Sequence, residues 1–285
     1  EHCGYTIRSG RNSPTAYLKI QGTNEDSVHV TGVQGGLAVV GGTADIYNGI
    51  YETVACENHT DGSTAFYAGY FTGESYVTST NIYGGTFTSC SKTAVMIGNG
   101  NEPPDSGAGE ESTVMIYGGT FTGGDATRTA VTVEKNNYAV GSATIYNGTF
   151  SSDVTEYLSA SVQIVQRGDE WVVGTLDDLA VAEVDDMKYT TLEEAVKAAQ
   201  QDGSSGTVTL LDDVTESITI AAGETIVLDL NGQTLTNTDG NHTITNNGTL
   251  TIQDTSTGGA GIVDNVSHGR AVLFNYSTVT LGAGT

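Results

Sequence analysis

The sequence predicts an all-β protein built as a parallel β-helix, a solenoid whose short strands stack from one coil to the next. Two observations carry this prediction: a hexapeptide that recurs at the spacing of one coil, and a composition rich in strand and turn residues. The 285 residues include 38 Gly but only 3 Pro, 3 Met and 1 Trp, and Thr, Val, Ile and Tyr are frequent. Those four residues suit a pleated sheet and Gly suits tight turns, so the composition excludes a helical bundle.

The hexapeptide reads Ile-Tyr, then Asn-Gly or Gly-Gly, and it ends on an aromatic residue. Its four copies begin at Ile46, Ile82, Ile116 and Ile145, so the spacings are 82 − 46 = 36, 116 − 82 = 34 and 145 − 116 = 29 residues. Such a period is too long for one strand and too short for a domain, and it suits one coil of a solenoid. The unequal spacings place insertions in turns, most visibly at Asn99–Glu111.

Local chemistry favours strands over helices within each period. β-Branched and other residues alternate in Thr93–Ile97 and Ala130–Val133. The central Asn-Gly or Gly-Gly of the hexapeptide allows the positive φ of a sharp corner, which a helix interior tolerates poorly. Each period therefore predicts short strands joined by tight turns, with successive coils about 4.8 Å apart.

The repeat predicts three ladders of equivalent side chains. The isoleucines that open the hexapeptides point into the core, and the aromatic residues that end them form a second inward ladder past the corner. This second ladder comprises Tyr51, Phe87, Phe121 and Phe150. The tyrosines that follow the isoleucines then point outward as a tyrosine stripe, which comprises Tyr47, Tyr83, Tyr117 and Tyr146.

Two interpretations of the tyrosine stripe stay open. Stacked tyrosines stabilise neighbouring strands, which would make the stripe purely structural. Alternatively, the stripe is an aromatic platform for sugar rings or for a partner protein. The four tyrosines are therefore the candidate ligand-binding residues.

The chain divides into three parts. Residues 1–165 hold the repeated coils, residues 166–186 form an acidic connector with the only tryptophan, Trp171, and residues 187–285 hold a capping helix and the first coils of a further β-helix. The connector is expected to hold one or two strands of its own, and its acidic run indicates a solvated surface. A calcium site is the alternative, but no ligand spacing is recognisable, so no metal is predicted.

One short α-helix is expected from Leu192 to about Gln201. Thr191 and Glu194 have the spacing of a capping box, and an apolar stripe recurs at helical spacing. A solenoid needs such a cap at its open end, where unpaired strand groups and core meet water. Strand-like runs follow at Thr207–Leu211, Ser217–Ile220, Thr225–Leu230, Thr243–Thr245, Thr249–Ile252, Ala271–Asn275 and Thr278–Leu281.

The segments Tyr189–Val196, Val208–Val214 and Leu228–Leu235 resemble the capped start of pectin-lyase-like right-handed β-helices. Such domains occur in surface and adhesin-like proteins of Gram-positive, often gut-dwelling, bacteria. The resemblance implies a right-handed solenoid and an extracellular or cell-surface location. The family includes polysaccharide lyases and glycosidases beside members without known catalysis, so the resemblance leaves the activity open.

The residues that catalysis requires in this family are not recognisable. Its lyases pair acidic calcium ligands with a basic Arg or Lys, and its glycosidases carry Gly-His-Gly and Arg-x-Lys elements. The nearest approach here is Ser267–Arg270, in which we interpret His268 as a turn or surface residue. Asp212 and Asp213 are interpreted as turn-forming. We therefore predict no catalytic residue and no cofactor.

The three cysteines are Cys3, Cys56 and Cys90, too few for a disulfide framework. Cys56 and Cys90 follow the hexapeptide at similar offsets and are expected to be neighbours in the stack. Buried thiols and a disulfide bond between them are the two alternatives.

The charge balance limits the partners. With 10 basic and 34 acidic side chains the net charge is 10 − 34 = −24, which disfavours nucleic acids and anionic membranes. No run approaches 18 apolar residues, so no membrane span is predicted. The predicted function is a non-catalytic surface module, a stalk or adhesin segment that presents a face to a glycan or a host or bacterial surface ligand. The alternative is a carbohydrate-active enzyme, or a glycan-binding relative, on the same fold.

The order of the parts predicts self-association. The capping helix follows the first coils, so the chain is expected to span the end of one β-helix and the start of another, or to be a phase-shifted unit of a tandem array. We expect Thr278–Thr285 to pair with Tyr5–Gln21, within the chain or from a neighbouring copy. Pairing with a neighbour would be head-to-tail and able to propagate as a fibre.

Overall fold

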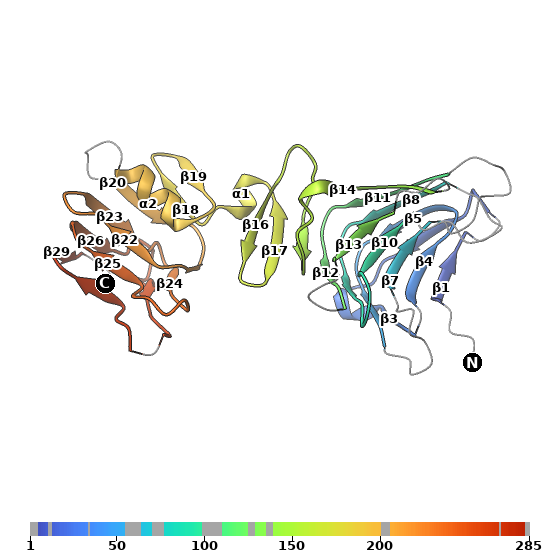
Figure 1. Ribbon diagram of the computed structural model, residues 1–285, viewed down its shortest axis with the longest axis horizontal. Helices are drawn as coiled ribbons and strands as arrows, with labels where there is room; N and C mark the ends of the chain where they lie inside the picture. The colour runs from blue at the N-terminus through green and yellow to red at the C-terminus, as the bar shows by residue number, and fades with distance from the viewer. Residues whose placement is uncertain are drawn as a thin grey trace. The chain divides into compact units, whose positions relative to one another are not determined.

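The structure is a computed structural model that describes residues 5–10, 13–33, 35–54, 64–69, 77–98, 110–124, 129–134, 139–200, 206–267 and 269–282. Strands hold 50% of the residues and helices 8%, so the protein is mostly β, as predicted. The chain divides into two compact units, Glu1–Thr175 and Leu176–Thr285. The division falls within the acidic stretch that was expected to be a connector. Figure 1 labels the elements of both units.

The first unit consists of three sheets that the chain visits in turn, so every third strand of β1–β15 joins the same sheet. Sheet A comprises β1 (Tyr5–Ser9), β4 (Gly35–Val39), β7 (Thr64–Ala68), β10 (Val95–Ile97) and β13 (Val131–Val133). Sheet B comprises β2 (Tyr17–Ile20), β5 (Gly42–Ile46), β8 (Thr78–Ile82), β11 (Glu110–Ile116) and β14 (Ala139–Ile145). Sheet C begins with β3 (His29–Gly32), β6 (Ile50–Thr53), β9 (Thr86–Thr88), β12 (Thr120–Thr122) and β15 (Gly148–Phe150). We call three consecutive strands, one in each sheet, a coil.

The strands of successive coils pair in parallel and in the register that the repeat predicts. Ile46 lies opposite Ile82, Ile82 opposite Ile116, and Ile116 opposite Ile145. All four side chains are fully buried. The predicted inward isoleucine ladder is confirmed.

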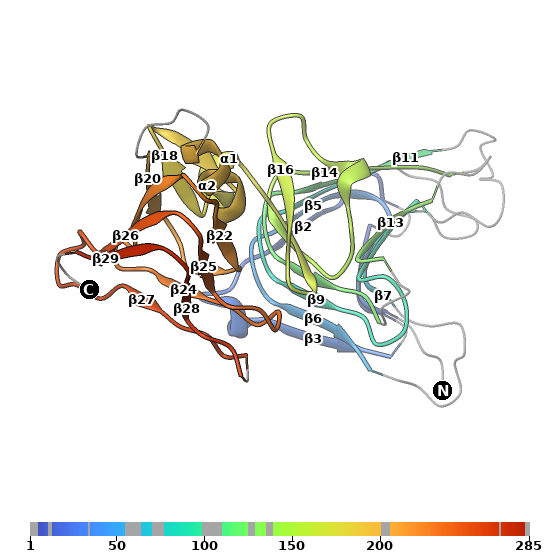
Figure 2. The ribbon, with the colours of Figure 1, turned by 60° about the vertical axis from the view of Figure 1, so that its left-hand side comes forward.

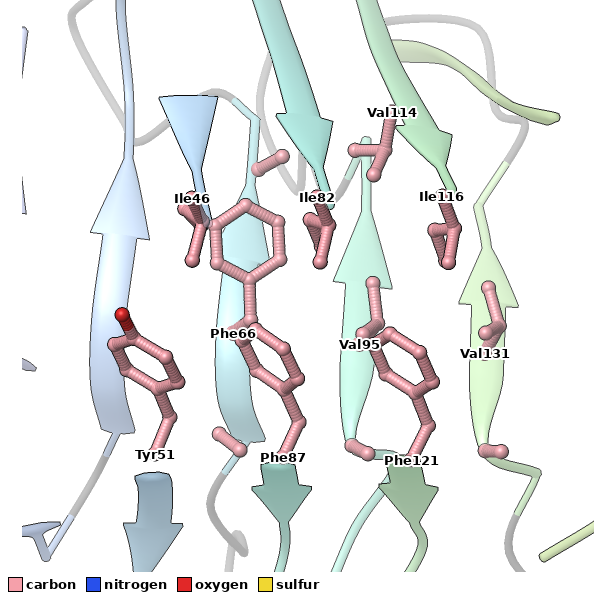
Figure 3. Close-up of a cluster of buried hydrophobic side chains, with 14 of the residues drawn as sticks. Ile46, Tyr51, Phe66, Ile82, Phe87, Val95, Val114, Ile116, Phe121 and Val131 are labelled. Atoms are coloured by element: carbon pink, nitrogen blue, oxygen red, sulfur yellow. The ribbon is translucent and has the colours of Figure 1, made fainter. Parts of the chain in front are cut away.

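The second inward ladder is also confirmed, and it forms a continuous aromatic stack. Figure 3 shows Tyr51, Phe87 and Phe121 in one row beneath the isoleucine row. The ring centroids of successive members lie 4.7, 5.0 and 5.0 Å apart, and the last contact joins Phe121 to Phe150. Each ring is completely buried. Because every coil contributes the same two large side chains, the core repeats with the backbone.

The corner between the two ladders requires glycine. The fourth residue of each hexapeptide has a positive φ, which is +112° at Gly85 and +117° at Gly119. A Cβ atom on Gly85 would also lie only 2.9 Å from the carbonyl oxygen of Gly49 in the preceding coil. The predicted left-handed corner is confirmed, and its tight stacking leaves no space for a side chain.

Sheet C ends in an antiparallel hairpin. β16 (Gln163–Arg167) pairs with β17 (Glu170–Gly174), and β17 pairs in turn with the last parallel strand, β15. Leu158 makes a single bridge to Ile145 at the end of sheet B, and Val154 is fully buried in the same core. Part of the expected connector is therefore a cap that closes the last coil.

The second unit also has three sheets visited in turn. Sheet D comprises β18 (Ala182–Val184), β19 (Met187–Tyr189), β20 (Gly206–Leu210), β23 (Thr225–Asp229), β26 (Thr249–Gln253) and β29 (Thr278–Leu281). Sheet E comprises β21 (Val214–Thr215), β24 (Thr234–Thr236) and β27 (Ile262–Val263). Sheet F comprises β22 (Ile218–Ile220), β25 (Ile244–Asn246) and β28 (Leu273–Asn275). The strands of sheet E were not predicted.

The predicted capping helix is α2 (Leu192–Gln200), which lies beside β18 and β20 in Figure 2 and also contacts β22 and β23. Its predicted apolar stripe is buried in the core of the unit and comprises Leu192, Ala195, Val196 and Ala199. The antiparallel hairpin β18–β19 closes the same end of sheet D through β20. A second helix, α1 (Leu176–Leu179), is one turn long and was not predicted.

The predicted pairing of residues 278–285 with residues 5–21 would join the two units, and it stays a prediction. Among the described residues, β29 pairs only with β26, whereas β1 pairs with β4 and β2 pairs with β5. Among the described residues, each unit has its own core cluster and its own sheets. Residues 283–285 lie outside the described residues, and pairing with a neighbouring copy stays a prediction.

Candidate functional site

The tyrosine stripe lies on the outward face of sheet B, as predicted. Tyr47, Tyr83 and Tyr117 have exposed fractions of 37%, 42% and 37%, whereas Tyr146 is half-buried. The rings form a continuous stack, with successive centroids 4.7, 5.2 and 4.8 Å apart and interplanar angles of 14°, 11° and 10°. One ring per coil therefore follows the repeat of the backbone.

This stacking determines which part of each ring a ligand can reach. The two faces of Tyr83 are covered by Tyr47 and Tyr117, and the two faces of Tyr117 by Tyr83 and Tyr146. The Nζ atom of Lys19 lies 5.0 Å from the centroid of the Tyr47 ring, a cation–π contact at one end of the stack. Ring edges and hydroxyl groups therefore face outward, and a sugar cannot lie flat on the inner rings.

A polar row runs beside the tyrosine stripe on the same face. Asp45 accepts hydrogen bonds from the Tyr17 hydroxyl at 2.8 Å and from Asn81 Nδ2 at 2.8 Å. The hydrogen bond to Asp45 raises the pKa of Tyr17, whose side chain is 60% exposed. Partial burial raises the pKa of Tyr83, and the nearby Asp45 carboxylate adds to this effect. Both phenols are therefore neutral donors at physiological pH.

The outward face of β8, β11 and β14 carries no charge at the positions beside the stripe. The register aligns Ser79, Thr113 and Ser142 in one row and Asn81, Met115 and Thr144 in another. In a chain with a net charge of −24, this is an uncharged patch of hydroxyl, amide and aromatic groups. Such groups are typical of adaptable, polar binding surfaces.

A second cluster, which sequence reasoning missed, lies on sheet A. Both faces of β4 and β7 are buried, and Tyr67 is only 2% exposed on the face opposite the main core. Its ring centroid lies 5.8 Å from that of Tyr5, and Arg8 and Glu134 are close enough to influence its ionisation. Burial raises the pKa of Tyr67 far above its ordinary value, so its phenol stays protonated. The only signal in the sequence was the run of small and apolar residues in these two strands.

The buried carboxylates of the second unit serve its turns. Asp229 accepts hydrogen bonds from the backbone N–H groups of Asn231 and Thr255, both at 3.0 Å, and from the Thr255 hydroxyl at 2.7 Å. Burial alone would raise the pKa of Asp229, but hydrogen bonds from Thr255, Asn231 and Gln253 outweigh it and hold the pKa below its ordinary value. Asp254 accepts from the N–H groups of Gly232, Ser256 and Gly261.

The paired carboxylates Asp212 and Asp213 have the turn role that was predicted. Asp212 Oδ1 accepts a hydrogen bond from the Asp213 N–H group at 2.9 Å. Asp213 Oδ1 accepts one from the Thr234 N–H group of the next coil at 2.7 Å.

Helix α2 is capped by a residue that the sequence did not indicate. The Glu194 N–H group donates to the Thr191 hydroxyl at 3.3 Å, which confirms one half of the predicted capping box. The Glu216 carboxylate accepts from the N–H groups of Leu192, at 3.0 Å, and Glu193, at 3.2 Å. Burial raises the pKa of Glu216, with smaller contributions from the Glu193 and Glu194 charges.

The remaining candidates lie in turns or outside the described residues. Ser267 Oγ accepts from the Gly240 N–H group at 3.1 Å, and Arg270 Nε donates to the Gly240 carbonyl. Asp264 accepts from the Asn265 N–H group at 2.7 Å. His268 lies outside the described residues, as do Cys3, Cys56 and nearly all of the insertion at Asn99–Glu111. The disulfide alternative for half-buried Cys90 therefore stays a prediction.

Acidic residues of the connector form an ion pair and a turn within the second unit. Asp177 forms an ion pair with Lys188 at 2.7 Å, and Asp185 and Asp186 form the tight turn between β18 and β19 with positive φ angles. Among the described residues, no group of three or more His, Cys, Asp or Glu side chains lies close enough together to hold a metal ion. Neither described α-helix approaches the length and apolarity that a membrane-spanning helix requires.

Comparison with known proteins does not assign the chain to a family. No protein-family model matches the chain, and no curated protein or solved structure is similar to it.

Proposed function

We propose that the chain is a right-handed parallel β-helix, similar to the pectin-lyase-like β-helices of bacterial surface proteins, and that it acts as a non-catalytic extracellular module. The parallel, in-register sheets visited in turn support the solenoid. The turn and cap roles of Asp229, Asp254 and Glu216 support a scaffold, because these carboxylates are engaged in holding the backbone.

The observation that carries the proposal is the stacked tyrosine stripe together with the uncharged outward positions beside it on β8, β11 and β14. Stacking holds the rings in one orientation before a ligand arrives, so little side-chain entropy is lost on binding. Because ring faces are covered, the tyrosine hydroxyls and the polar row around Asn81 are the recognition groups. A hydroxyl-rich glycan, or a polar surface of a host or bacterial partner, matches them.

The experiment is a glycan array probed with the whole chain and with two variants. Tyr83→Phe keeps the stack and removes one hydroxyl group, whereas Thr88→Val removes a hydroxyl group from sheet C as the matched control. Binding that falls with Tyr83→Phe and stays with Thr88→Val would support the proposal. Binding that is unchanged in both variants, or no binding at all, would contradict it.

A carbohydrate-active enzyme is the second candidate, and the cluster on sheet A is the observation that favours it. Tyr67 is a buried phenol influenced by Arg8 and Glu134, and perturbed ionisable groups gather at catalytic sites. The test is a lyase assay on acidic polysaccharides, read as the release of unsaturated sugars. Activity that is lost in Tyr67→Phe and retained in Tyr157→Phe would establish the enzyme and reject the non-catalytic proposal.

A further inference from the structure

The tyrosines of the stripe lie close enough together to react with one another. Each follows the last residue of a sheet B strand, β5, β8, β11 or β14, and these strands are neighbours in Figure 1. The centroids of successive rings are 4.7, 5.2 and 4.8 Å apart, and their planes differ by 14°, 11° and 10°. Nearly parallel rings at the same place in successive coils are related almost by translation. Equivalent carbon atoms of two neighbours are therefore also separated by about 5 Å, the strand spacing.

The reactive part of each ring faces outward. Coupling of phenols takes place at the ring carbons beside the phenolic oxygen, which are at the tip of the tyrosine side chain. Tyr47, Tyr83 and Tyr117 have exposed fractions of 37%, 42% and 37%, and this exposure belongs to their edges because neighbouring rings cover the faces. A small tilt of two exposed edges toward each other closes the gap between these carbons.

One-electron oxidation joins phenols that are held in this way. Each of two neighbouring tyrosines loses one electron and its phenolic proton and becomes a neutral phenoxyl radical. A C–C bond then forms between the two ring carbons beside the oxygens. Each carbon passes its hydrogen to its own oxygen, which restores two phenols joined as dityrosine. The two electrons and two protons that were removed reduce one hydrogen peroxide molecule to two water molecules.

The charge of the chain favours coupling within one molecule over coupling between two. Two copies that each have a net charge of −24 repel each other. Neighbouring rings of one stripe are already held together, which corresponds to a very high effective concentration of one phenol around the next. The aligned positions beside the stripe on β8, β11 and β14 are uncharged, so they do not oppose the approach of a neutral oxidant.

We propose that the tyrosine stripe is a site of oxidative cross-linking, at which a peroxidase and hydrogen peroxide join tyrosines of successive coils as dityrosine. Each bond connects residues that are 36, 34 or 29 positions apart in the chain and fastens one coil to the next. A cross-link of this span restricts the unfolded chain and thereby stabilises the fold. The inference does not depend on glycan binding, so failure of one proposal leaves the other standing.

The test is oxidation of the whole, dilute chain with a plant peroxidase and hydrogen peroxide. Dityrosine is measured by its fluorescence, and the joined peptides are identified by mass spectrometry. Digestion after Asp and Glu places the four tyrosines on separate peptides, so each bond identifies its two residues. We expect a monomeric product with bonds between neighbouring members of the stripe, and no dityrosine when the peroxidase is left out.

Tyrosine-to-phenylalanine variants keep the rings stacked and remove single coupling partners. Tyr83→Phe should lose the bonds to Tyr47 and Tyr117 and keep the bond between Tyr117 and Tyr146. The double variant Tyr47→Phe with Tyr117→Phe leaves no two neighbouring tyrosines in the stripe and should lose all three bonds.

The matched control is Tyr189→Phe with Tyr276→Phe, which removes two tyrosines from the second unit. Tyr276 is 70% exposed and packs against Phe274, so this control tests whether exposure alone decides the reaction. The control should keep all three stripe bonds.

Thermal unfolding gives a second readout. The oxidised chain should unfold at a midpoint about 5–10 °C above that of the double variant oxidised in parallel, since only the former carries cross-links between coils. The proposal is overturned if no bond joins two members of the stripe, or if the double variant and the control give equal yields. Covalent dimers as the main product, or equal midpoints, would also overturn it.

Discussion

Trp171 lies opposite Phe150 in the antiparallel pair of β15 and β17, where the parallel stack of the first unit ends. The indole is half-buried against the core, so it covers the last ring of the inward aromatic ladder. Unpaired edge strands and exposed core favour aggregation. Pairing with β17 covers the edge of β15, and the Trp171 side chain covers the end of the core.

Replacement of Trp171 should therefore destabilise the first unit. Trp171→Ala is expected to lower the free energy of unfolding by about 2 kcal/mol, less than for a fully buried aromatic because the indole is half-exposed. Denaturant titration followed by circular dichroism measures the change. Gln163→Ala, an exposed position on β16, should change it by less than about 0.5 kcal/mol, and an equal effect of both variants would show that Trp171 is no cap.

The isoleucine ladder makes a sharper prediction at Ile116, which is fully buried between Ile82 and Ile145. Ile116→Asp would bury an unpaired carboxylate and should cost more than about 4 kcal/mol, enough to unfold the stack. Ile116→Val removes one methylene and should cost about 1 kcal/mol. A folded Ile116→Asp variant with normal stability would exclude the inward ladder.

The tyrosine stripe predicts a stability difference between two replacements of Tyr83. Tyr83→Ala removes two ring contacts and should cost about 1–2 kcal/mol, whereas Tyr83→Phe keeps both contacts and should cost almost nothing. Thermal unfolding of the two variants gives the comparison. If the two variants are equally stable, the ring contacts of Tyr83 contribute nothing to the stability of the fold.

Asp229 predicts a loss of stability that depends on pH. Its pKa is below the ordinary value in the folded protein, so its contribution is present above about pH 4 and is lost as pH falls through the folded pKa. Asp229→Asn should cost about 2 kcal/mol at pH 7, because Asn cannot accept all of these hydrogen bonds. Denaturant titrations at pH 7 and pH 2.5 should show the difference from the unmodified chain shrink in acid. A stability difference that is the same at pH 7 and pH 2.5 would contradict the lowered pKa of Asp229.

Glu216 predicts a change of stability with pH that is opposite in sign to that of Asp229. Its pKa is raised in the folded protein, so folding favours the protonated acid and stability is lost as pH rises through the folded pKa. Glu216→Gln should therefore gain stability relative to the unmodified chain between pH 4 and pH 7. Glu216→Ala removes the helix cap and should cost about 1 kcal/mol at pH 4, and less at pH 7, where the unmodified chain has lost part of the Glu216 contribution. Measuring both variants separates the loss of charge from the loss of the cap.

The interior of the first unit was predictable because four copies of one hexapeptide mark the same inward and outward positions. Ile82 and Phe87 each have equivalent residues in the other three copies, so the pattern does not depend on a single position. The corner was predictable for a similar reason, since only glycine fits the positive φ at Gly85 and Gly119. Stacking of the tyrosine stripe was also expected from the coil spacing, but the ring orientations, which decide what a ligand can reach, come only from the structure.

The parts that escaped prediction depend on contacts distant in sequence or on very short strands. Val214–Thr215 has two residues, too few for any alternation to appear. Glu216 reaches Leu192 across 24 residues, and only the folded chain brings the two together. Strands were expected in the stretch that holds β16 and β17, but their antiparallel pairing was not, because this hairpin occurs once and lacks the repetition that identified the coils.

The register between Ile82 and Ile116 has a consequence for how such a chain can change in length. Removal of residues 83–116 would join Ile82 to Tyr117 and recreate an Ile-Tyr-Gly-Gly-Thr-Phe sequence at the junction. The strands on either side would meet in their original alignment, because the two isoleucines occupy the same place in the stack. Unequal recombination between copies of the hexapeptide can thus lengthen or shorten the protein by whole coils, without changing the sequence at either end.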